Sequence, residues 1–491
     1  PYHIIPRVLD GGPPDGARDF RAGLQTAHLA WQQLIHRSSW LRDRLSDFCR
    51  ARLEERFQRP IEFVEHHVAH AASAYFTGPW PEATVVTCDN MGDGDSAAVF
   101  HGRSGRVRRL WSVGAWHSPG QFYGEVASFL GINAMTAGKV TGLAARGKLQ
   151  PALRLLEGRL AISPDGRRFK GPPLRERRSG AATWKRLSEL PPEDTAAAAQ
   201  ACLERSILGF IEAAVAETGC GQVAVAGGVF GNVTLNRKIA ELPCVDGLWV
   251  HPAMSDQGIA LGAALHALSA TTRLAPRAME HVYLGPSYQE ADIERALDAA
   301  GARYARPTDL TAAVADLLAE GKVVARFDGA LEYGPRALGN RSILVRPDDP
   351  DINDWLNERL GRSEFMPFAP ISLASSADAL YEINPALRPC LPFMTAAVPV
   401  RRPEDMSHAG VVHVDGTARP QLLEASTNPG MYAILEAFEQ RTGIPSLVNT
   451  SFNLHGEPIV CSPTDALRTF REGGLDALVL GPYLLVASST S

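Results

Sequence analysis

The chain has 491 residues, of which 45% are hydrophobic and 21% are charged, and this composition is typical of a globular protein with roughly two to four domains. Its formal net charge is −5 and its isoelectric point is about 6.3, which argues against a basic nucleic-acid-binding surface. Its 7 cysteines form no CxxC pair, and no apolar run reaches the ~18 residues of a membrane span, so we expect a cytoplasmic protein without zinc knuckles, disulfides or a membrane partner.

The beginning of the chain is polar and rich in arginine, with helical periodicity between residues 24 and 53. Because the chain starts at Pro1 inside this pattern and shows no signal peptide, we expect a further segment to precede it.

The first candidate site begins with two histidines four residues apart. On a helix, His66 and His70 would lie on one face within reach of a single metal ion. Asp89 follows a predicted buried strand at 83–87 and precedes a glycine-rich turn and an alternating partner strand at 96–100. Imidazoles and a carboxylate suit iron, zinc, copper or nickel. Ordinary surface or core histidines remain an alternative for this spacing.

A second glycine-rich turn follows a long predicted helix at 196–217 and a strand at 223–226. Gly227, Gly228 and Asn232 lie between that strand and a helix at 233–240, which is the arrangement of an anion-binding helix N-terminus. Close strand-to-helix packing explains such a turn equally well. Asp256 precedes a small-residue helix at 259–270, where its spacing favours a helix cap over a metal ligand.

The composition changes at about residue 280, where we place a domain boundary. Beyond it, the sequence predicts helices at 289–300 and 310–320 and a strand at 323–327. Three polar turns follow, which carry Arg336 with Arg341, Arg419, and Ser451 with Asn453. Guanidinium groups bind phosphate dianions in a bidentate way, so these turns indicate a phosphate site. A surface salt bridge is the alternative for each arginine taken alone.

Taken together, several segments resemble the O-carbamoyltransferases of antibiotic and nodulation-factor biosynthesis. These segments occur in the family's order, at residues 66–75, 138–147, 226–232, 256–264, 332–344, 415–419 and 449–458. The resemblance implies an α/β protein with an actin-like, threonylcarbamoyl-transferase-like (ASKHA) domain at 1–280 and a YrdC-like α/β domain at 281–491. It also implies that the second domain makes carbamoyl adenylate from carbamoyl phosphate and ATP with Mg²⁺. The first domain then transfers the carbamoyl group to a natural-product hydroxyl beside a metal, usually Fe(II).

The resemblance also implies roles for particular residues. The implied metal ligands are His66, His70, Asp89 and Asp256. The implied nucleotide-binding residues are Gly227, Gly228, Asn232, Arg341 and Asn453, and the implied catalytic residues are Arg336, Arg419 and Ser451.

The chain departs from the family pattern in three places. The family's His-Asp-Ala motif is absent, Asn90 stands where glycine is usual, and Arg359 or Arg362 would have to replace a lysine. The acceptor cannot be read from the sequence, although we expect residues 1–60 and 111–123 to line its pocket.

One alternative is a tRNA threonylcarbamoyl-adenosine-type transferase, which shares both folds but which the acidic charge disfavours. Another is a regulator related to hydrogenase maturation factors, which the lack of CxxC pairs disfavours. The expected partners are carbamoyl phosphate, ATP, a hydroxylated small molecule and a second copy of the chain, with no nucleic acid.

Overall fold

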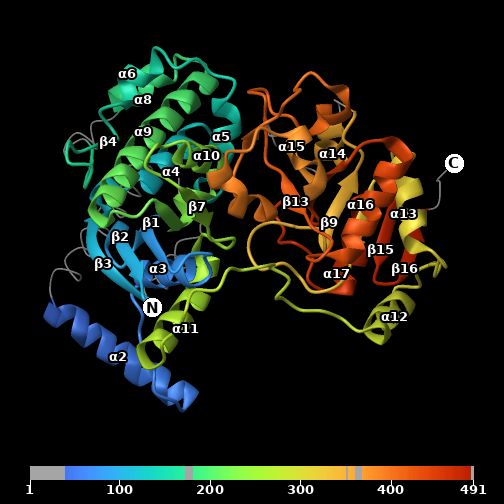
Figure 1. Ribbon diagram of the computed structural model, residues 1–491, viewed down its shortest axis with the longest axis horizontal. Coiled ribbons are helices and arrows are strands. Elements are labelled where there is room, and N and C mark those ends of the chain that lie inside the picture. The colour runs from blue at the N-terminus through green and yellow to red at the C-terminus, as the bar shows by residue number, and fades with distance from the viewer. Residues whose placement is uncertain (1–38, 172–180, 350–351, 360–367, 488–491) are drawn as a thin grey trace, which may run out of the picture.

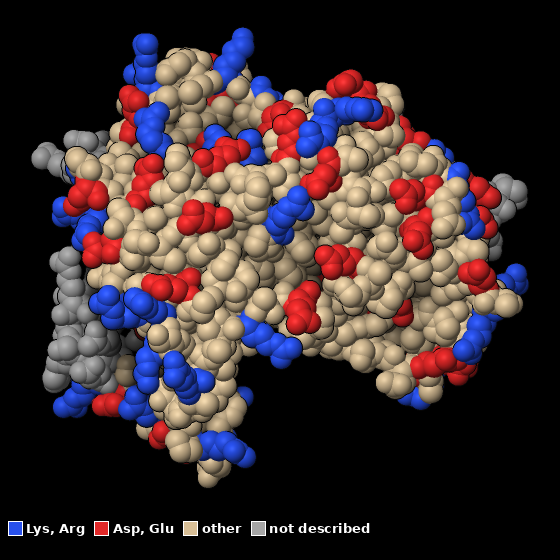
Figure 2. Space-filling model, viewed as in Figure 1, with Lys and Arg blue, Asp and Glu red and all other residues tan. Residues whose placement is uncertain are grey.

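The computed structural model describes residues 39–171, 181–349, 352–359 and 368–487, which form two α/β units (Figure 1). Each unit is built around its own mixed β-sheet, one of five strands and one of seven, which confirms the expected α/β class. No helix in this part of the chain has the length and hydropathy needed to span a bilayer. On the face shown in Figure 2, acidic and basic side chains are interspersed over both units.

The first sheet has the strand order β3-β2-β1-β6-β7. Its members are β1 (Glu82–Gly92), β2 (Asp95–Arg103), β3 (Arg106–Gly114), β6 (Gln222–Ala226) and β7 (Gly247–Val250). The first three strands form an antiparallel meander, and β6 and β7 continue it in parallel from β1. This is the strand arrangement expected of one half of an actin-like domain. The carboxyl ends of β1, β6 and β7 therefore meet at one edge, which is where α/β sheets commonly carry their sites.

Helices cover both faces of this sheet because its strands alternate between two cores. Val85 and Ala98 pack toward α3 (His66–Phe76), whereas Val86 and Val99 pack toward α9 (Pro192–Thr218). α11 (Ile259–Thr271) lies so close to α3 that a Cβ on Gly262 would be 1.8 Å from the carbonyl oxygen of Ala69. The predicted strands at 83–87 and 96–100 and the helices at 196–217 and 259–270 are thus confirmed.

The other elements of the first unit are shorter or lie outside its sheet. The first half of the predicted helix at 24–53 lies outside the described residues, and its second half, residues 39–53, coincides with α2 (Ser39–Phe57). The elements of the first unit outside its sheet and its main helices are α2 (Ser39–Phe57), α4 (Pro119–Phe129), α5 (Lys139–Ala144), α6 (Ala152–Leu156), β4 (Ala161–Ile162), β5 (Phe169–Lys170), α8 (Ala181–Leu187) and α10 (Val233–Ala240).

The second sheet has the strand order β13-β10-β14-β9-β8-β15-β16. Its members are β8 (Val324–Phe327), β9 (Arg341–Val345), β10 (Ala369–Leu373), β13 (Gln421–Leu423), β14 (Ser446–Ser451), β15 (Ala477–Leu480) and β16 (Tyr483–Val486). One face packs on α12 (Glu290–Ala299) and α17 (Pro463–Glu472), and the other on α13 (Leu310–Ala319) and α16 (Pro429–Thr442). Two further helices, α14 (Ile352–Arg359) and α15 (Ala377–Leu380), and a small ribbon of β11 (Val398–Pro399) with β12 (Thr417–Ala418) complete the unit.

The strands of the two sheets fall on either side of residue 280, but one later segment packs against the first unit. This 3-10 segment, η7 (Pro385–Phe393), lies along β7. The thiol of Cys390 donates to the carbonyl of Leu248, and the rings of Phe393 and Trp249 meet edge to face at 5.5 Å. The amide of Asn236 donates to the carbonyl of Thr395 over 2.7 Å. The two units therefore share buried polar and apolar contacts.

Candidate metal centre and anion site

The first half of the metal centre is the amino-terminal turn of α3. Two carboxylates cap this turn, since Glu65 accepts from the backbone N–H of Val68 and Asp93 accepts from that of His66, both over 2.8 Å. The cap fixes the start of the helix, and its 3.6-residue period then places His66 and His70 on one face. Their Nε2 atoms lie 3.1 Å apart.

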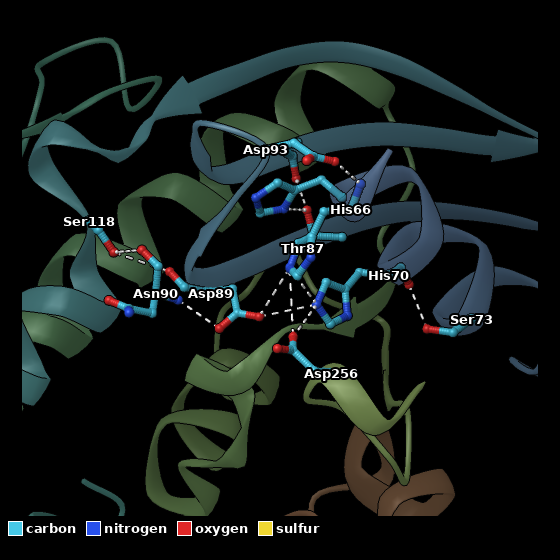
Figure 3. A network of polar contacts seen from close by, with 11 residues as sticks. His66, His70, Ser73, Thr87, Asp89, Asn90, Asp93, Ser118 and Asp256 are labelled. Atoms are coloured by element: carbon cyan, nitrogen blue, oxygen red, sulfur yellow. Dashed lines mark hydrogen bonds and ion pairs between the residues drawn. The ribbon is translucent and has the colours of Figure 1, made fainter. Parts of the chain in front are cut away.

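Two carboxylates from other elements complete the cluster (Figure 3). Asp89, near the end of β1, places Oδ2 at 3.1 Å from Nε2 of His70 and 3.4 Å from Nε2 of His66. Asp256, in the turn before α11, places Oδ1 at 3.6 Å and 3.7 Å from the same two nitrogens. All four donor atoms lie within 4.8 Å of one another, so the structure brings together the four residues that the family resemblance implied as metal ligands.

The spacing of these donors fits a divalent cation. Metal–nitrogen and metal–oxygen bonds of about 2.0–2.2 Å place neighbouring tetrahedral ligands about 3.3–3.6 Å apart. The observed contacts of 3.1–3.7 Å between the nitrogens and carboxylate oxygens fall around that range. Two imidazoles with two carboxylates make a borderline donor set that suits iron(II) or zinc.

The electrostatics of the cluster also favour a bound cation. Burial disfavours a charged His70, but the carboxylates of Asp256 and Asp89 outweigh it and raise the pKa of this histidine. Burial likewise disfavours the Asp89 anion, but hydrogen bonds from His66 and His70 lower the pKa of this carboxyl. The negative charges of the cluster therefore attract a positive charge, which a proton or a metal ion can supply.

Asp256 is the most exposed member of the cluster. The side chain of His70 is fully enclosed and that of Asp89 is 13% exposed, whereas that of Asp256 is 62% exposed. A ligand would therefore reach the cluster past Asp256.

Two glycines make room for the cluster. An ideal Cβ on Gly92 would lie 2.0 Å from Cδ2 of His66, so only glycine lets this ring pack against β1. The signal in the sequence was the glycine-rich turn after Asp89. Gly228 lies beside the cluster, since its Cβ would be 3.1 Å from Oδ1 of Asp89.

The remaining residues of the second glycine-rich turn serve the fold. Gly227 has a φ of +112°, and a Cβ there would lie 2.1 Å from the carbonyl oxygen of Cys88, so it allows β6 to lie close to β1. The side chain of Asn232 caps α10 by accepting from the N–H of Leu235 over 3.0 Å, and its amide donates to Gln200. Its side chain is thus occupied, and Gly228 is the predicted nucleotide-turn residue that lies nearest the metal centre.

The candidate anion site of the second unit centres on Arg336 and Arg419. Both side chains are half-buried, and neither has an ion pair or a side-chain hydrogen bond within the described part of the chain. Burial lowers the pKa of Arg336, and burial together with the charge of Arg336 lowers that of Arg419. Two neighbouring guanidinium groups without a counter-ion are a strong electrostatic attraction for an anion.

Buried amides tie the polar turns of this unit together. Gln421, two residues after Arg419, donates to the carbonyl of Leu338 over 2.8 Å. Asn449 donates to the carbonyl of Ala337 over 3.2 Å and to the Gln421 side chain over 2.9 Å. The segments that carry Arg336 and Arg419 therefore converge with the end of β14. Neither amide was predicted to have a role, although Gln421 stands two residues after the segment 415–419 and Asn449 begins the segment 449–458.

The turn after β14 lies at the same edge of the sheet. The hydroxyl of Ser451 donates to Oδ1 of Asn453 over 2.5 Å, and the amide of Asn453 donates to the carbonyl of Glu457 over 2.9 Å. Ser451 on β14 pairs with Ser342 on β9. The turn after β14 therefore lies next to the loop between β8 and β9, residues 328–340, which carries Arg336 and is called the arginine loop below.

Arg341 has a different environment from the other two arginines. It is fully buried, and its guanidinium lies 3.6 Å from the centre of the Phe327 ring. Its Nη atoms donate to the carbonyls of Asp328 and Gly329 over 2.9 Å and 3.1 Å. This geometry favours a structural role over the predicted contact with nucleotide. The side chain of Arg359 and all of Arg362 lie outside the described residues.

Two family models match separate parts of the chain. The carbamoyltransferase N-terminus model matches residues 14–265, and the carbamoyltransferase C-terminus model matches residues 315–487. Nodulation protein NolNO of Sinorhizobium fredii is 35% identical over 445 residues, which cover 88% of this chain and 65% of that protein. Nodulation protein NolO of Bradyrhizobium diazoefficiens is 35% identical over 435 residues, which cover 86% of this chain and 78% of that protein.

Among solved structures, full-length HypF in its phosphate- and nucleotide-bound form matches 37% of this chain and 26% of its own, with 20% identity. Its TM-score of 0.26 is too low to support a comparison of folds. The two family models and the nodulation relatives together show that the chain belongs to the carbamoyltransferase family.

Proposed function

We propose that this chain is an ATP-dependent O-carbamoyltransferase that moves a carbamoyl group from carbamoyl phosphate, through carbamoyl adenylate, to a hydroxyl of a natural product. One observation carries the proposal. A single chain places two unpaired guanidinium groups in one α/β unit and a two-histidine, two-carboxylate cluster in the other. The first suits a phosphorylated donor, and the second suits activation of a hydroxyl.

In the second unit, Arg336 and Arg419 would bind the phosphate oxygens of carbamoyl phosphate and of Mg²⁺-ATP. Water first releases phosphate and leaves carbamate, and a carbamate oxygen then attacks the α-phosphorus of ATP while pyrophosphate leaves. Both steps build negative charge on phosphoryl oxygens, which fixed guanidinium groups stabilise. Ser451 and Asn453 lie at the same sheet edge and would contact the nucleotide.

In the first unit, His66, His70, Asp89 and Asp256 would hold Fe(II) or another divalent ion. When bound, such an ion supplies a Lewis acid that polarises the carbamoyl oxygen and acidifies the acceptor hydroxyl. The exposed side at Asp256 would admit the acceptor, whereas the enclosed side at His70 would exclude water. The acceptor oxygen attacks the carbamoyl carbon, and AMP leaves.

The acceptor class is suggested by the relatives. Two of them are named as nodulation proteins, and we propose a hydroxylated oligosaccharide or another natural product for this chain as well. A tRNA acceptor is disfavoured because the net charge is −5 and because acidic and basic groups are interspersed on the face in Figure 2.

The experiment combines two assays of the full chain, loaded anaerobically with Fe(II) and supplied with Mg²⁺-ATP. Pyrophosphate release should depend on carbamoyl phosphate. Mass spectrometry should then detect a gain of one carbamoyl group on one member of a panel of a chitin tetrasaccharide, an aminoglycoside and a macrolactone. A parallel reaction with tRNA, threonine and bicarbonate tests the alternative acceptor.

Two variants separate the half-reactions. Arg419→Ala should abolish pyrophosphate release, whereas the double variant His66→Ala/His70→Ala should keep it and lose carbamoylated product. The proposal would be refuted if the rate of pyrophosphate release did not depend on carbamoyl phosphate, or if Arg419→Ala released pyrophosphate at the wild-type rate.

A further inference from the structure

A buried histidine at the end of β7 connects the two units. His251 is fully enclosed, and its Nδ1 lies 3.0 Å from the hydroxyl oxygen of Thr77, at the end of α3. Its Nε2 lies 3.2 Å from the hydroxyl of Tyr333, which belongs to the arginine loop of the second unit. The two rings also meet edge to face with centroids 5.7 Å apart.

The hydrogen bonds determine which nitrogen of His251 carries the proton. The hydroxyl of Thr77 donates its single hydrogen to the carbonyl of Ser73 over 2.6 Å. Thr77 must therefore accept from the Nδ1–H of His251, which leaves Nε2 as an acceptor for the hydroxyl of Tyr333. Burial, assisted by the charge of His70, lowers the pKa of His251 to about 3, so the ring is neutral at physiological pH.

The hydrogen-bonded chain Thr77–His251–Tyr333, called the relay below, lies close to two of the candidate metal ligands. Ser73 donates to the carbonyl of His70, so the Thr77 end of the relay stands on the ligand helix. The turn of Asp256 folds back over His251, since a Cβ on Gly258 would lie 2.9 Å from Cδ2 of the ring.

On the side of the anion site, Tyr333 stands three residues before Arg336. The next residue, Gly334, has a φ of +113°, and its Cβ would lie 3.0 Å from the carbonyl oxygen of Pro252. The backbone of the arginine loop therefore rests directly on the backbone that leads to Asp256.

We propose that His251 and Tyr333 are positioning residues that hold the arginine loop in register with the metal centre. This inference rests on the proposed function, because only a reaction with two sites needs them in register. Carbamoyl adenylate must leave the first site and reach the second before water attacks it. A loop that is held less firmly would release more of the intermediate to water, where it decomposes to carbamate and AMP.

Tyr333→Phe tests the functional part, with the chitin tetrasaccharide as acceptor probe. The variant keeps the ring and removes one hydroxyl, so carbamoyl-phosphate-dependent pyrophosphate release should stay within about twofold of the wild type. Carbamoylated product per pyrophosphate should fall about threefold or more, the factor expected from losing one hydrogen bond. Tyr381→Phe is the matched control, because its buried hydroxyl contacts Ser372 within the second unit only, and it should keep the wild-type ratio.

A second measurement does not depend on activity. In protein labelled with ¹⁵N-histidine, the His251 signals, assigned with His251→Gln, should show a neutral ring protonated at Nδ1. Tyr333→Phe should shift the Nε2 signal and keep the proton on Nδ1. Thr77→Val removes the acceptor of the Nδ1–H, so the Nδ1–H tautomer should no longer be fixed.

An Nε2–H or cationic ring would overturn the relay, and an unchanged product-to-pyrophosphate ratio in Tyr333→Phe would overturn its positioning role. A wild type without carbamoyl-phosphate-dependent pyrophosphate release would refute the proposed function, and the spectra would still decide whether the relay exists.

Discussion

Replacing Gly92 with alanine tests the metal centre without changing a ligand. The new Cβ would lie 2.0 Å from Cδ2 and 2.1 Å from Cγ of His66, where carbon atoms normally approach to about 3.5–4.0 Å. Gly92 has no left-handed φ, so its backbone accepts alanine and the strain falls on the contact with His66. The ring must move by about 1.5 Å to restore normal packing. Such a shift is half of its 3.1 Å distance to Nε2 of His70, so His66 would leave the cluster.

The expected loss can be bracketed. Disturbing the support of a metal ligand typically costs 10–100-fold in affinity, which corresponds to about 1.4–2.7 kcal/mol. Overpacking adds a stability cost of about 1–3 kcal/mol. We therefore expect Gly92→Ala to remain folded, to bind metal at least about tenfold more weakly and to resemble His66→Ala in this respect.

The assay is a competition titration of the metal-free protein with Co²⁺ and a chromophoric chelator, with the cobalt absorption spectrum as a second readout. Gly158→Ala is the matched control, because nothing lies within 4 Å of the new methyl group. Thermal unfolding of each variant shows that the fold is kept. Wild-type affinity and an unchanged cobalt spectrum in Gly92→Ala would show that His66 is not a ligand in this arrangement.

Three further predictions concern the second unit. Arg419→Ala removes one of two neighbouring charges that repel each other, so its resting fold should be at least as stable as wild type. The variant should also abolish the rise in melting temperature that phosphate causes, measured by scanning fluorimetry. Arg341→Lys should lower the free energy of unfolding in urea by about 2 kcal/mol or more, because one ammonium group cannot donate to both carbonyls, of Asp328 and Gly329, that the planar guanidinium binds. Pyrophosphate release per folded molecule should persist in this variant. Burial opposes ionisation of Asp415, but bonds from His413 and Thr417 outweigh it and lower its pKa to about 2, so its carboxylate stabilises the fold above about pH 4. Asp415→Asn should therefore be about 1 kcal/mol less stable at pH 7 in urea unfolding, and the difference should close as the pH falls from 4 to 2.

The grouping of two histidines and a carboxylate was predictable from the sequence because its geometry is mostly local. The spacing of His66 and His70 follows from the helical period, and Asp89 follows from a strand that ends where a glycine-rich turn begins. Asp256 is different, since its spacing favoured a helix cap and only the family resemblance indicated a ligand. In the structure its carboxylate faces the two histidines, and no side-chain cap bond is formed at that helix start.

The environment of each arginine was not predictable, because it depends on distant segments. Arg336 and Arg341 stand five residues apart in one motif. Among the described residues the first has no side-chain partner, whereas the second donates to backbone carbonyls. The same holds for Gln421 and Asn449, whose bonds to residues 337–338 span 83 and 112 positions of sequence. A pattern in the sequence reports periodicity within an element, whereas these roles arise where elements from different parts of the chain meet.

The placement of Arg336 and Arg419 depends on two buried amides nearby. Two like charges at the surface of a loose loop would separate and become hydrated, which would relieve their repulsion. Here Asn449 and Gln421 donate to the carbonyls of Ala337 and Leu338, directly after Arg336, and Gln421 itself stands two residues after Arg419. These bonds tie the two arginine-bearing segments together, and both arginine side chains are half-buried. The fold thus maintains an unfavourable charge arrangement that an anion of two or more charges relieves, and phosphate binding is favoured by as much as the resting site is destabilised. Because Tyr333 belongs to the same loop as Arg336, its contact with His251 joins the candidate anion site to the segment that leads to Asp256.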